Sequence, residues 1–272
     1  MTYSLLLSDG SSFSLNGEGV QFVLKNSMTL TEMSLQKSSN IIERSYGDGS
    51  VKIGSSRLAA SVLTLIGTMV FQDDADARIT LNNLLSALNE AEYLVDETSG
   101  LRTPVDLSSP VITWEDGSYL RNGELSVELT QLVPYWESSE PIVVAQSVEA
   151  GVPIDVDVAN TGYADVPFSV SVTVAEQSTA VEYVEIQNIA EGHDITIESD
   201  SFGLEEYTQL IVDTGEGTAY LLNEEAGTFI DAQGAFPSGS GYFNLLRGIN
   251  TLALRCAVDA TFSFSYRPRY FV

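Results

Sequence analysis

The segment Pro167–Val174, PFSVSVTV, alternates apolar and hydroxyl side chains without interruption. Apolar residues occupy every second position and hydroxyl residues stand between them: Phe168, Val170, Val172 and Val174, then Ser169, Ser171 and Thr173. Because successive side chains of a β-strand point to opposite faces, this period of two predicts a strand with one buried and one solvated face. The segment is therefore typical of an antiparallel sheet that packs against a core on one side only.

The same alternation recurs on both sides of this segment. Residues 153–160, PIDVDVAN, alternate aliphatic side chains with aspartates, and residues 124–132, ELSVELTQL, place Leu125, Val127 and Leu129 on one face. The apolar positions of a further strand near the chain end are Val258, Ala260, Phe262 and Phe264. Gly, Asn, Asp or Ser separates such segments about every eight to twelve residues, which predicts a mainly β fold built as an antiparallel sandwich or barrel.

Two segments of the first half follow other patterns. Residues 61–71, SVLTLIGTMVF, are continuously apolar and rich in β-branched residues, which predicts a strand buried on both faces. In residues 73–95 the apolar positions have helical spacing: Leu81, Leu84, Leu85, Leu88, Ala91 and Val95. Acidic residues at its start favour a helix dipole, and Gly100 is the expected stop. We therefore expect one amphipathic helix that covers a sheet.

A change in composition marks the boundary between two domains. Residues 132–153, LVPYWESSEPIVVAQSVEAGVP, cluster prolines, serines and glutamates, and the alternation pauses there. We place an N-terminal domain at residues 1–135, a connection at residues 136–152 and a C-terminal sandwich at residues 153–262.

The charge of the chain excludes several classes of partner. The formal net charge is −26, and no Lys or Arg occurs between Arg121 and Arg247. Such a surface repels phosphates, which disfavours specific nucleic-acid binding and acidic membranes. Solubility and a high-salt habitat remain alternative causes of the acidity. No run of 18 apolar residues predicts a membrane span, and the first residues lack the basic segment of a signal peptide.

The sequence predicts no catalytic, cofactor-binding or metal-binding residues. His193, the single histidine, lies in a turn that leads into a strand, and Cys256, the single cysteine, lies in an apolar strand that predicts a buried thiol. The acidic groups at residues 73–76 and 223–227 are better interpreted as a helix start and a hairpin turn than as calcium ligands. A two-carboxylate glycosidase remains open, although it needs a cleft that the sequence does not reveal.

Three motifs in a fixed order carry a family resemblance. Residues 57–67 combine an arginine with an L-x-L-x-G strand, and Arg78 then begins the leucine-rich helix. The second motif is Asn160, Gly162 and Pro167, and the third is Leu245, Gly248 and Asn250. This order resembles the distal tail protein family of siphophages. The likeness covers most of the chain, although each motif alone is only a turn with alternating residues.

The resemblance implies a fold and a structural role. It implies an N-terminal ring domain, a β-sandwich or split barrel with one covering helix, followed by a galectin-like antiparallel β-sandwich. Such proteins form a six-membered ring, without enzymatic activity or cofactor, at the distal end of a virion tail assembled in the bacterial cytoplasm. The implied partners are further copies of the chain, the tail tube, tape-measure and tail-tip hub proteins, and receptor-binding proteins held by the outer domain.

The resemblance also bears on the chain end and on alternative functions. It implies that residues 247–250, RGIN, form the turn before a late strand, with Gly248 at positive φ and Asn250 tolerant of it. In some family members the end returns to the ring domain, so residues 263–272 are a candidate addition to the first domain, with Arg267 and Arg269 meeting carboxylates. Arginines on a surface strand that face water are the alternative. A lectin-like carbohydrate-binding module and another tail or tube component also remain open. We transfer no sugar site, because Trp114 and Trp136 are the only tryptophans.

Overall fold

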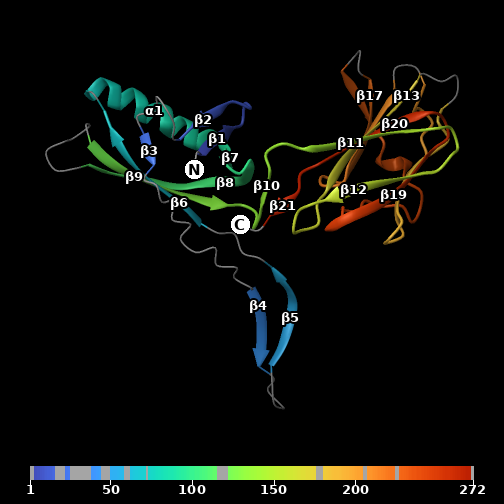
Figure 1. The fold of residues 1–272 in the computed structure, drawn as a ribbon, viewed down its shortest axis with the longest axis horizontal. Helices are drawn as coiled ribbons and strands as arrows, with labels where there is room; N and C mark the ends of the chain where they lie inside the picture. The colour runs from blue at the N-terminus through green and yellow to red at the C-terminus, as the bar shows by residue number, and fades with distance from the viewer. Residues whose placement is uncertain are drawn as a thin grey trace. The chain divides into compact units, whose positions relative to one another are not determined.

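The computed structural model describes residues 3–15, 22–24, 38–43, 50–57, 62–71, 73–114, 122–175, 180–204, 207–223 and 227–270 (Figure 1). The chain divides into two compact units, Met1–Ser139 and Glu140–Tyr270. Strands dominate both units, and the described residues contain a single α-helix, which confirms the predicted mainly β class. No helix among these residues is long and apolar enough to cross a membrane.

One antiparallel sheet organises the first unit. Its strands lie in the order β2–β1–β7–β8–β9–β6–β3, and β10 pairs with the start of β8. Their bounds are β1 Tyr3–Leu7, β2 Ser12–Ser14, β3 Phe22–Leu24, β6 Val62–Val70, β7 Ala91–Asp96, β8 Leu101–Trp114, β9 Asn122–Gln131 and β10 Trp136–Ser138. The long strand β8 pairs with β7 up to Pro104 and with β9 from Val105 onward, and so joins both parts of the sheet. Strands β4, Ser38–Glu43, and β5, Ser50–Arg57, form a separate hairpin.

The helix α1, Asp74–Glu90, covers this sheet, as predicted (Figure 1). Asp73 is its N-cap, and the side chain accepts hydrogen bonds from the backbone N–H groups of Ala75 and Asp76. The buried helix residues pack in one core with the sheet: Ala77, Leu81, Leu84, Ala87 and Leu88. The helical spacing and the acidic start therefore predicted a real element, and Leu81, Leu84 and Leu88 of its predicted apolar face are buried. Leu85, which was predicted on the same face, is 36% exposed.

The predicted end of the helix was wrong. The helix stops at Glu90, and Ala91 and Val95 belong to strand β7. Strand β7 pairs with β1 on one side and with β8 on the other, and its Leu94 is fully buried. Strand pairing thus overrides the helical spacing of the last two positions. Gly100 has a φ of +66° and lies just before β8, not at the helix end.

Strand β6 is also not buried on both faces. Leu63, Leu65 and Met69 face the core, whereas Val62 and Val70, at the two ends, are 44% and 56% exposed. The strand lies between β9 and β3, so its backbone is paired on both sides, but only one of its faces meets the core. A continuous apolar run in the sequence cannot distinguish a strand that is paired along both edges from a strand that is buried on both faces.

The second unit is a β-sandwich. One sheet has the order β11–β20–β13–β16–β17–β18, and the other has the order β12–β19–β14–β15. The bounds are β11 Ile142–Val148, β12 Ile154–Asn160, β13 Phe168–Val174, β14 Val184–Asn188, β15 His193–Ile197, β16 Gln209–Asp213, β17 Thr218–Asn223, β18 Thr228–Asp231, β19 Gly248–Cys256 and β20 Ala260–Tyr266. The short strand β21, Arg269–Tyr270, follows them and belongs to neither of these two sheets. Residues of both sheets form one core, including Val170 and Val172 from β13 and Leu252 and Leu254 from β19.

The predicted alternation of the strands is confirmed, except that Val258 lies before β20 and is only half-buried. Phe168, Val170, Val172 and Val174 are buried, as are Leu125, Val127 and Leu129 in β9 and Ala260, Phe262 and Phe264 in β20. The division between the units falls inside the predicted connection 136–152, and residues 142–148 of that connection form strand β11 of the second unit. Residues 263–266, which the sequence assigned to the tail, complete β20 of the same unit.

Candidate structural sites at the connection and the chain end

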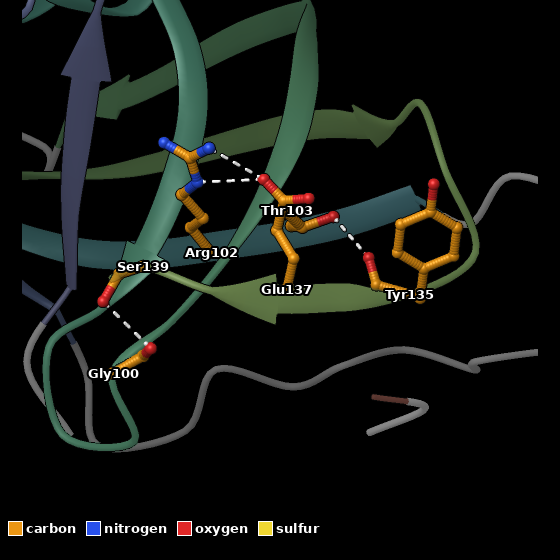
Figure 2. Close-up of polar contacts among 6 residues, drawn as sticks. All are labelled: Gly100, Arg102, Thr103, Tyr135, Glu137 and Ser139. Atoms are coloured by element: carbon orange, nitrogen blue, oxygen red, sulfur yellow. Dashed lines mark hydrogen bonds and ion pairs between the residues drawn. The ribbon is translucent and has the colours of Figure 1, made fainter. Parts of the chain in front are cut away.

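A buried polar cluster fixes the segment that follows β9 onto the start of β8. The Thr103 hydroxyl donates to the Tyr135 carbonyl over 3.1 Å, as Figure 2 shows. The Gln131 amide donates both to Thr103 Oγ1, at 2.9 Å, and to the Tyr135 carbonyl, at 3.2 Å. Gln131 and Thr103 are fully buried, so these bonds satisfy groups that water cannot reach.

An ion pair and a turn extend this cluster along β10. Nε and Nη2 of Arg102 both donate to Oε1 of Glu137, at 3.0 and 2.8 Å (Figure 2). The guanidinium also lies over the Tyr93 ring, 4.1 Å from its centroid. Further along, the N–H and hydroxyl of Ser139 both donate to the Gly100 carbonyl. The first unit therefore ends in a segment held by side chains from three sequence regions.

In the second unit, the second motif of the resemblance closes a tight turn. Oδ1 of Asn160 accepts from the N–H of Gly162, and Nδ2 donates to the carbonyls of Ala164 and Leu245. An isolated β-bridge between Val166 and Leu245 lies next to this turn. Asn160 is buried, so its amide is an internal crosslink between segments about 85 residues apart in the sequence.

The third motif supplies the other half of this contact. Gly248 has a φ of +102°, which confirms the predicted left-handed turn. The expectation that Asn250 tolerates such a turn was wrong, because Asn250 lies in strand β19 opposite Val158. Its side chain instead bonds the backbone of Leu246 twice, by accepting from the N–H and donating to the carbonyl at 2.8 Å each. The two asparagines thus order the loop before β19.

The chain end crosses the Asn160 turn in close backbone contact. A Cβ atom added to Gly162 would lie 2.6 Å from both N and O of Arg269. The N–H of Tyr163 donates to the Arg269 carbonyl over 2.7 Å, and the rings of Tyr163 and Tyr270 meet edge to face. The Arg247 guanidinium lies 5.1 Å from the Tyr163 ring centroid. The sequence motifs were recognised, but the contact of the Asn160 turn with β21 was not predicted.

The other residues singled out from the sequence have structural roles or no contacts that indicate chemistry. His193 is exposed, and its nearest ion-pair partner is Glu191 at 3.5 Å. Cys256 is buried, as predicted, and burial raises the pKa of its thiol. Within the described ranges, no three His, Cys, Asp or Glu side chains gather as metal ligands. Residues 58–61 of the first motif and 224–226 of the acidic turn lie outside the described residues.

Comparison with solved structures gives the fold a precedent. The crystal structure of the phage SPP1 Dit protein is similar to this chain, with a TM-score of 0.68 and 15% sequence identity. The likeness covers 98% of this chain and 99% of the SPP1 protein. That structure is presented as a paradigm of the hub adsorption apparatus in phages that infect Gram-positive hosts. The chain has the fold of a phage distal tail protein. The resemblance read from the three motifs is thereby confirmed at the level of the fold.

Two structures of the phage p2 baseplate in its activated conformation contain chains of the same fold. The structure with Ca gives a TM-score of 0.56 at 7% identity and covers 98% of this chain and 97% of the other. The structure with Sr gives 0.55 at 8% identity and covers 97% of both chains. No protein-family model and no curated protein matches the sequence. The distal tail fold is thus retained at very low identity.

Proposed function

We propose that the chain is a distal tail protein, a structural virion component at the far end of a phage tail. The observation that carries this proposal is the end-to-end likeness to the SPP1 Dit protein, which includes both units and nearly all of both chains. A shared isolated sandwich would carry little functional weight, because such folds serve many functions. Two units in the same order are a more specific likeness.

In this proposal the first unit forms a ring and the second unit projects from it. The ring, of six copies, joins the tail tube and tape-measure protein to the tail-tip hub, and the second unit holds receptor-binding proteins. The cluster around Gln131, Thr103 and Arg102 supports this role, because it gives the chain a fixed course where it leaves the first unit. The protein is a scaffold and not an enzyme, and phage DNA passes through the ring without specific contacts.

The solution mass of the intact chain tests the proposal. Light scattering behind a sizing column, at several protein and salt concentrations, is expected to give six times the chain mass of 29.4 kDa. Negative-stain microscopy of the same fraction is expected to show rings. Salt is a necessary variable, because chains of net charge −26 repel each other at low ionic strength. A single-chain mass under all conditions, with and without the tail tube protein of the same phage, would contradict the proposal.

A further inference from the structure

Strand β18, Thr228–Asp231, forms an open edge of the six-stranded sheet in the second unit. Among the described strands it pairs only with β17. All four of its residues are exposed, including Phe229 at 71% and Ile230 at 40%. These two side chains point to opposite faces of the sheet, because successive residues of a strand alternate. The strand therefore presents apolar side chains on both faces, and none of them belongs to the core.

The backbone groups of alternate residues in β18 face away from the sheet. The N–H of Ala232 donates to the Ala219 carbonyl, which continues the ladder between β17 and β18. In an antiparallel pair, every second residue of a strand bonds the neighbouring strand. Ile230 therefore bonds β17, whereas the N–H and C=O groups of Phe229 and Asp231 point to the open side. These groups have the spacing that a further strand needs for pairing.

The chain protects other edges of the sandwich in ways that β18 lacks. The four-stranded sheet ends at β15, where the Ser240 hydroxyl accepts from the N–H of Thr196 over 2.7 Å. The six-stranded sheet begins at β11, and Ile142 and Val144 of that strand pack against the core. Strand β18 has neither such a cover nor such a core contact among the described residues. An exposed edge of this kind is a template for pairing with another chain.

The charge around β18 indicates which kind of chain fits the edge. Asp231 ends the strand, and Glu224 and Glu225 precede it closely in the sequence. Residues 140–270 contain 20 Asp and Glu, four Arg and no Lys, a formal net charge of −16. Such a unit attracts a basic segment and repels a second copy of itself. Charge complementarity therefore favours a basic partner at this edge.

We propose that β18 binds an extended, basic segment of another protein, which joins the six-stranded sheet as a further antiparallel strand. The backbone of the segment pairs with the outward groups of Phe229 and Asp231 through up to about four hydrogen bonds. Its apolar side chains pack beside Phe229 and Ile230, and its Lys or Arg residues lie near the flanking carboxylates. Backbone pairing then supplies affinity and the side chains set the register. The inference goes beyond the proposed function, because the edge belongs to the second unit and does not require a ring.

A synthetic peptide tests the binding of such a segment to the full chain. The probe is a fluorescein-labelled seven-residue peptide with lysine at both ends and alternating valine and threonine between them. Fluorescence anisotropy at about 0.15 M NaCl gives the dissociation constant. A second peptide has the same charge but proline at its centre, which removes a backbone donor. We expect this second peptide to bind at least about tenfold more weakly, the equivalent of one lost anchor.

Hydrogen exchange locates the bound peptide on the protein. We expect the valine–threonine peptide to slow exchange at the backbone amides of Phe229 and Asp231, because these N–H groups become paired. Exchange at the other edge strand, β11, is expected to stay unchanged. A peptide held only by the negative charge of the unit would not slow exchange at β18, so this measurement separates strand pairing from general attraction.

Two proline variants of the full chain test the edge from the side of the protein. Phe229→Pro removes an outward N–H of β18 and leaves the groups that bond β17, a position where an edge strand tolerates proline. Val143→Pro is the matched control, because Val143 is 59% exposed on β11 and the same alternation turns its N–H away from β20. We expect Phe229→Pro to raise the dissociation constant of the peptide at least about tenfold, and Val143→Pro to leave it unchanged.

A charge variant tests the edge without changing the backbone. Asp231→Asn keeps the Oδ1 atom that accepts from the N–H of Gln233 and removes the negative charge. We expect it to raise the dissociation constant about twofold to fivefold at low salt, as for one exposed ion pair. The difference is expected to shrink as salt screens the charges. If Phe229→Pro fails to fold, this variant and the proline peptide still decide the proposal.

Several outcomes would overturn the proposal. Absence of binding at about 1 mM peptide, equal binding of the proline peptide, unchanged binding in Phe229→Pro or an equal loss in Val143→Pro would each do so. Slow exchange at residues 228–231 without peptide, increasing with protein concentration, would assign the edge to a second copy and reject a basic partner. The mass of the chain judges the ring separately: peptide binding by a chain that forms no ring would support the open edge and reject the ring.

Discussion

At the scale of single residues, buried amides and one glycine determine how the chain end is held. Asn160 and Asn250 each bond backbone groups of the loop before β19, at Leu245 and Leu246. Neither asparagine is interpretable from the sequence as more than a turn residue, because Asn is common in turns for its own backbone preferences. Their partners are far apart along the chain, and only the folded structure makes them crosslinks.

Gly162 is predicted to be essential for this arrangement. The variant Gly162→Ala places a Cβ atom 2.6 Å from two backbone atoms of Arg269, so either the turn or strand β21 must move. We expect a loss of about 1–3 kcal/mol in the free energy of unfolding, as for other overpacked sites, and faster hydrogen exchange at Tyr163. Gly234→Ala is the control, since nothing lies within 4 Å of its added Cβ atom. Equal stability of the two variants would show that the close contact of Gly162 with Arg269 does not contribute to the stability of the fold.

Cys256 is predicted to link stability to alkaline pH. Burial raises the pKa of its thiol above the ordinary value of 9.0, so the folded state holds the proton more tightly than the unfolded state. This contribution is fully present below pH 9.0 and is lost as the pH rises through the folded pKa. We expect the melting temperature to fall above that pH, and to fall less steeply in Cys256→Ala. Parallel curves for the two proteins would exclude the thiol as a cause.

The thiol is also expected to be inert. A maleimide at neutral pH should label Cys256 in denaturant but not in the native protein, because the thiolate is the reactive form and the side chain is buried.

At the scale of helices and strands, local sequence signals predicted the start of helix α1 but not its end. Asp73 and the acidic first turn mark the beginning of α1 because capping uses groups next to each other in the sequence. The end of the helix depends on β7, whose pairing with β1 and β8 involves residues far away. The prediction for strand β6 failed for the same reason, because the sequence does not show which face of the strand the core covers.

The short strand β10 is predicted to depend on the pair of Arg102 and Glu137. Both side chains are 15% exposed, and two donors of the arginine meet one oxygen. In a double-mutant cycle with Arg102→Ala and Glu137→Ala, we expect a coupling of about 1 kcal/mol, the upper end of the range for exposed pairs. Arg102→Lys keeps the charge but not the fork, and is expected to lose part of the coupling. Additive effects of the two alanine variants would mean that the pair contributes nothing.

At the scale of the whole molecule, charge is the dominant property. The net charge of −26 favours solubility but opposes both compact folding and association of copies. The second unit carries most of this charge, but only two described residues on the outward face of its six-stranded sheet are charged, Asp213 and Asp231. The order of the sequence conceals this exception, because the strands of that sheet are spread over residues 142–266.

Stability is predicted to rise with ionic strength. Salt screens the repulsion among carboxylates more than it weakens the few ion pairs, so the melting temperature should increase between about 0.01 and 0.5 M NaCl. Calorimetry at several protein concentrations separates this effect from association, because only association depends on the protein concentration. A melting temperature that is flat or falling over this range would contradict a dominant role for repulsion.

Local sequence patterns were sufficient to predict the mainly β class, the buried faces of β9, β13 and β20, the helix start, the buried thiol and the order of motifs that led to the distal tail fold. These features rest on periodicity and turn chemistry, which act between neighbouring residues. The folded structure alone shows where α1 ends, that the second face of β6 is only half-buried, that the Asn160 turn meets both the loop before β19 and strand β21, and that the outward face of the six-stranded sheet carries little charge. Each of these depends on strand pairing between distant segments, and a local pattern carries no information about which distant segment becomes the neighbour.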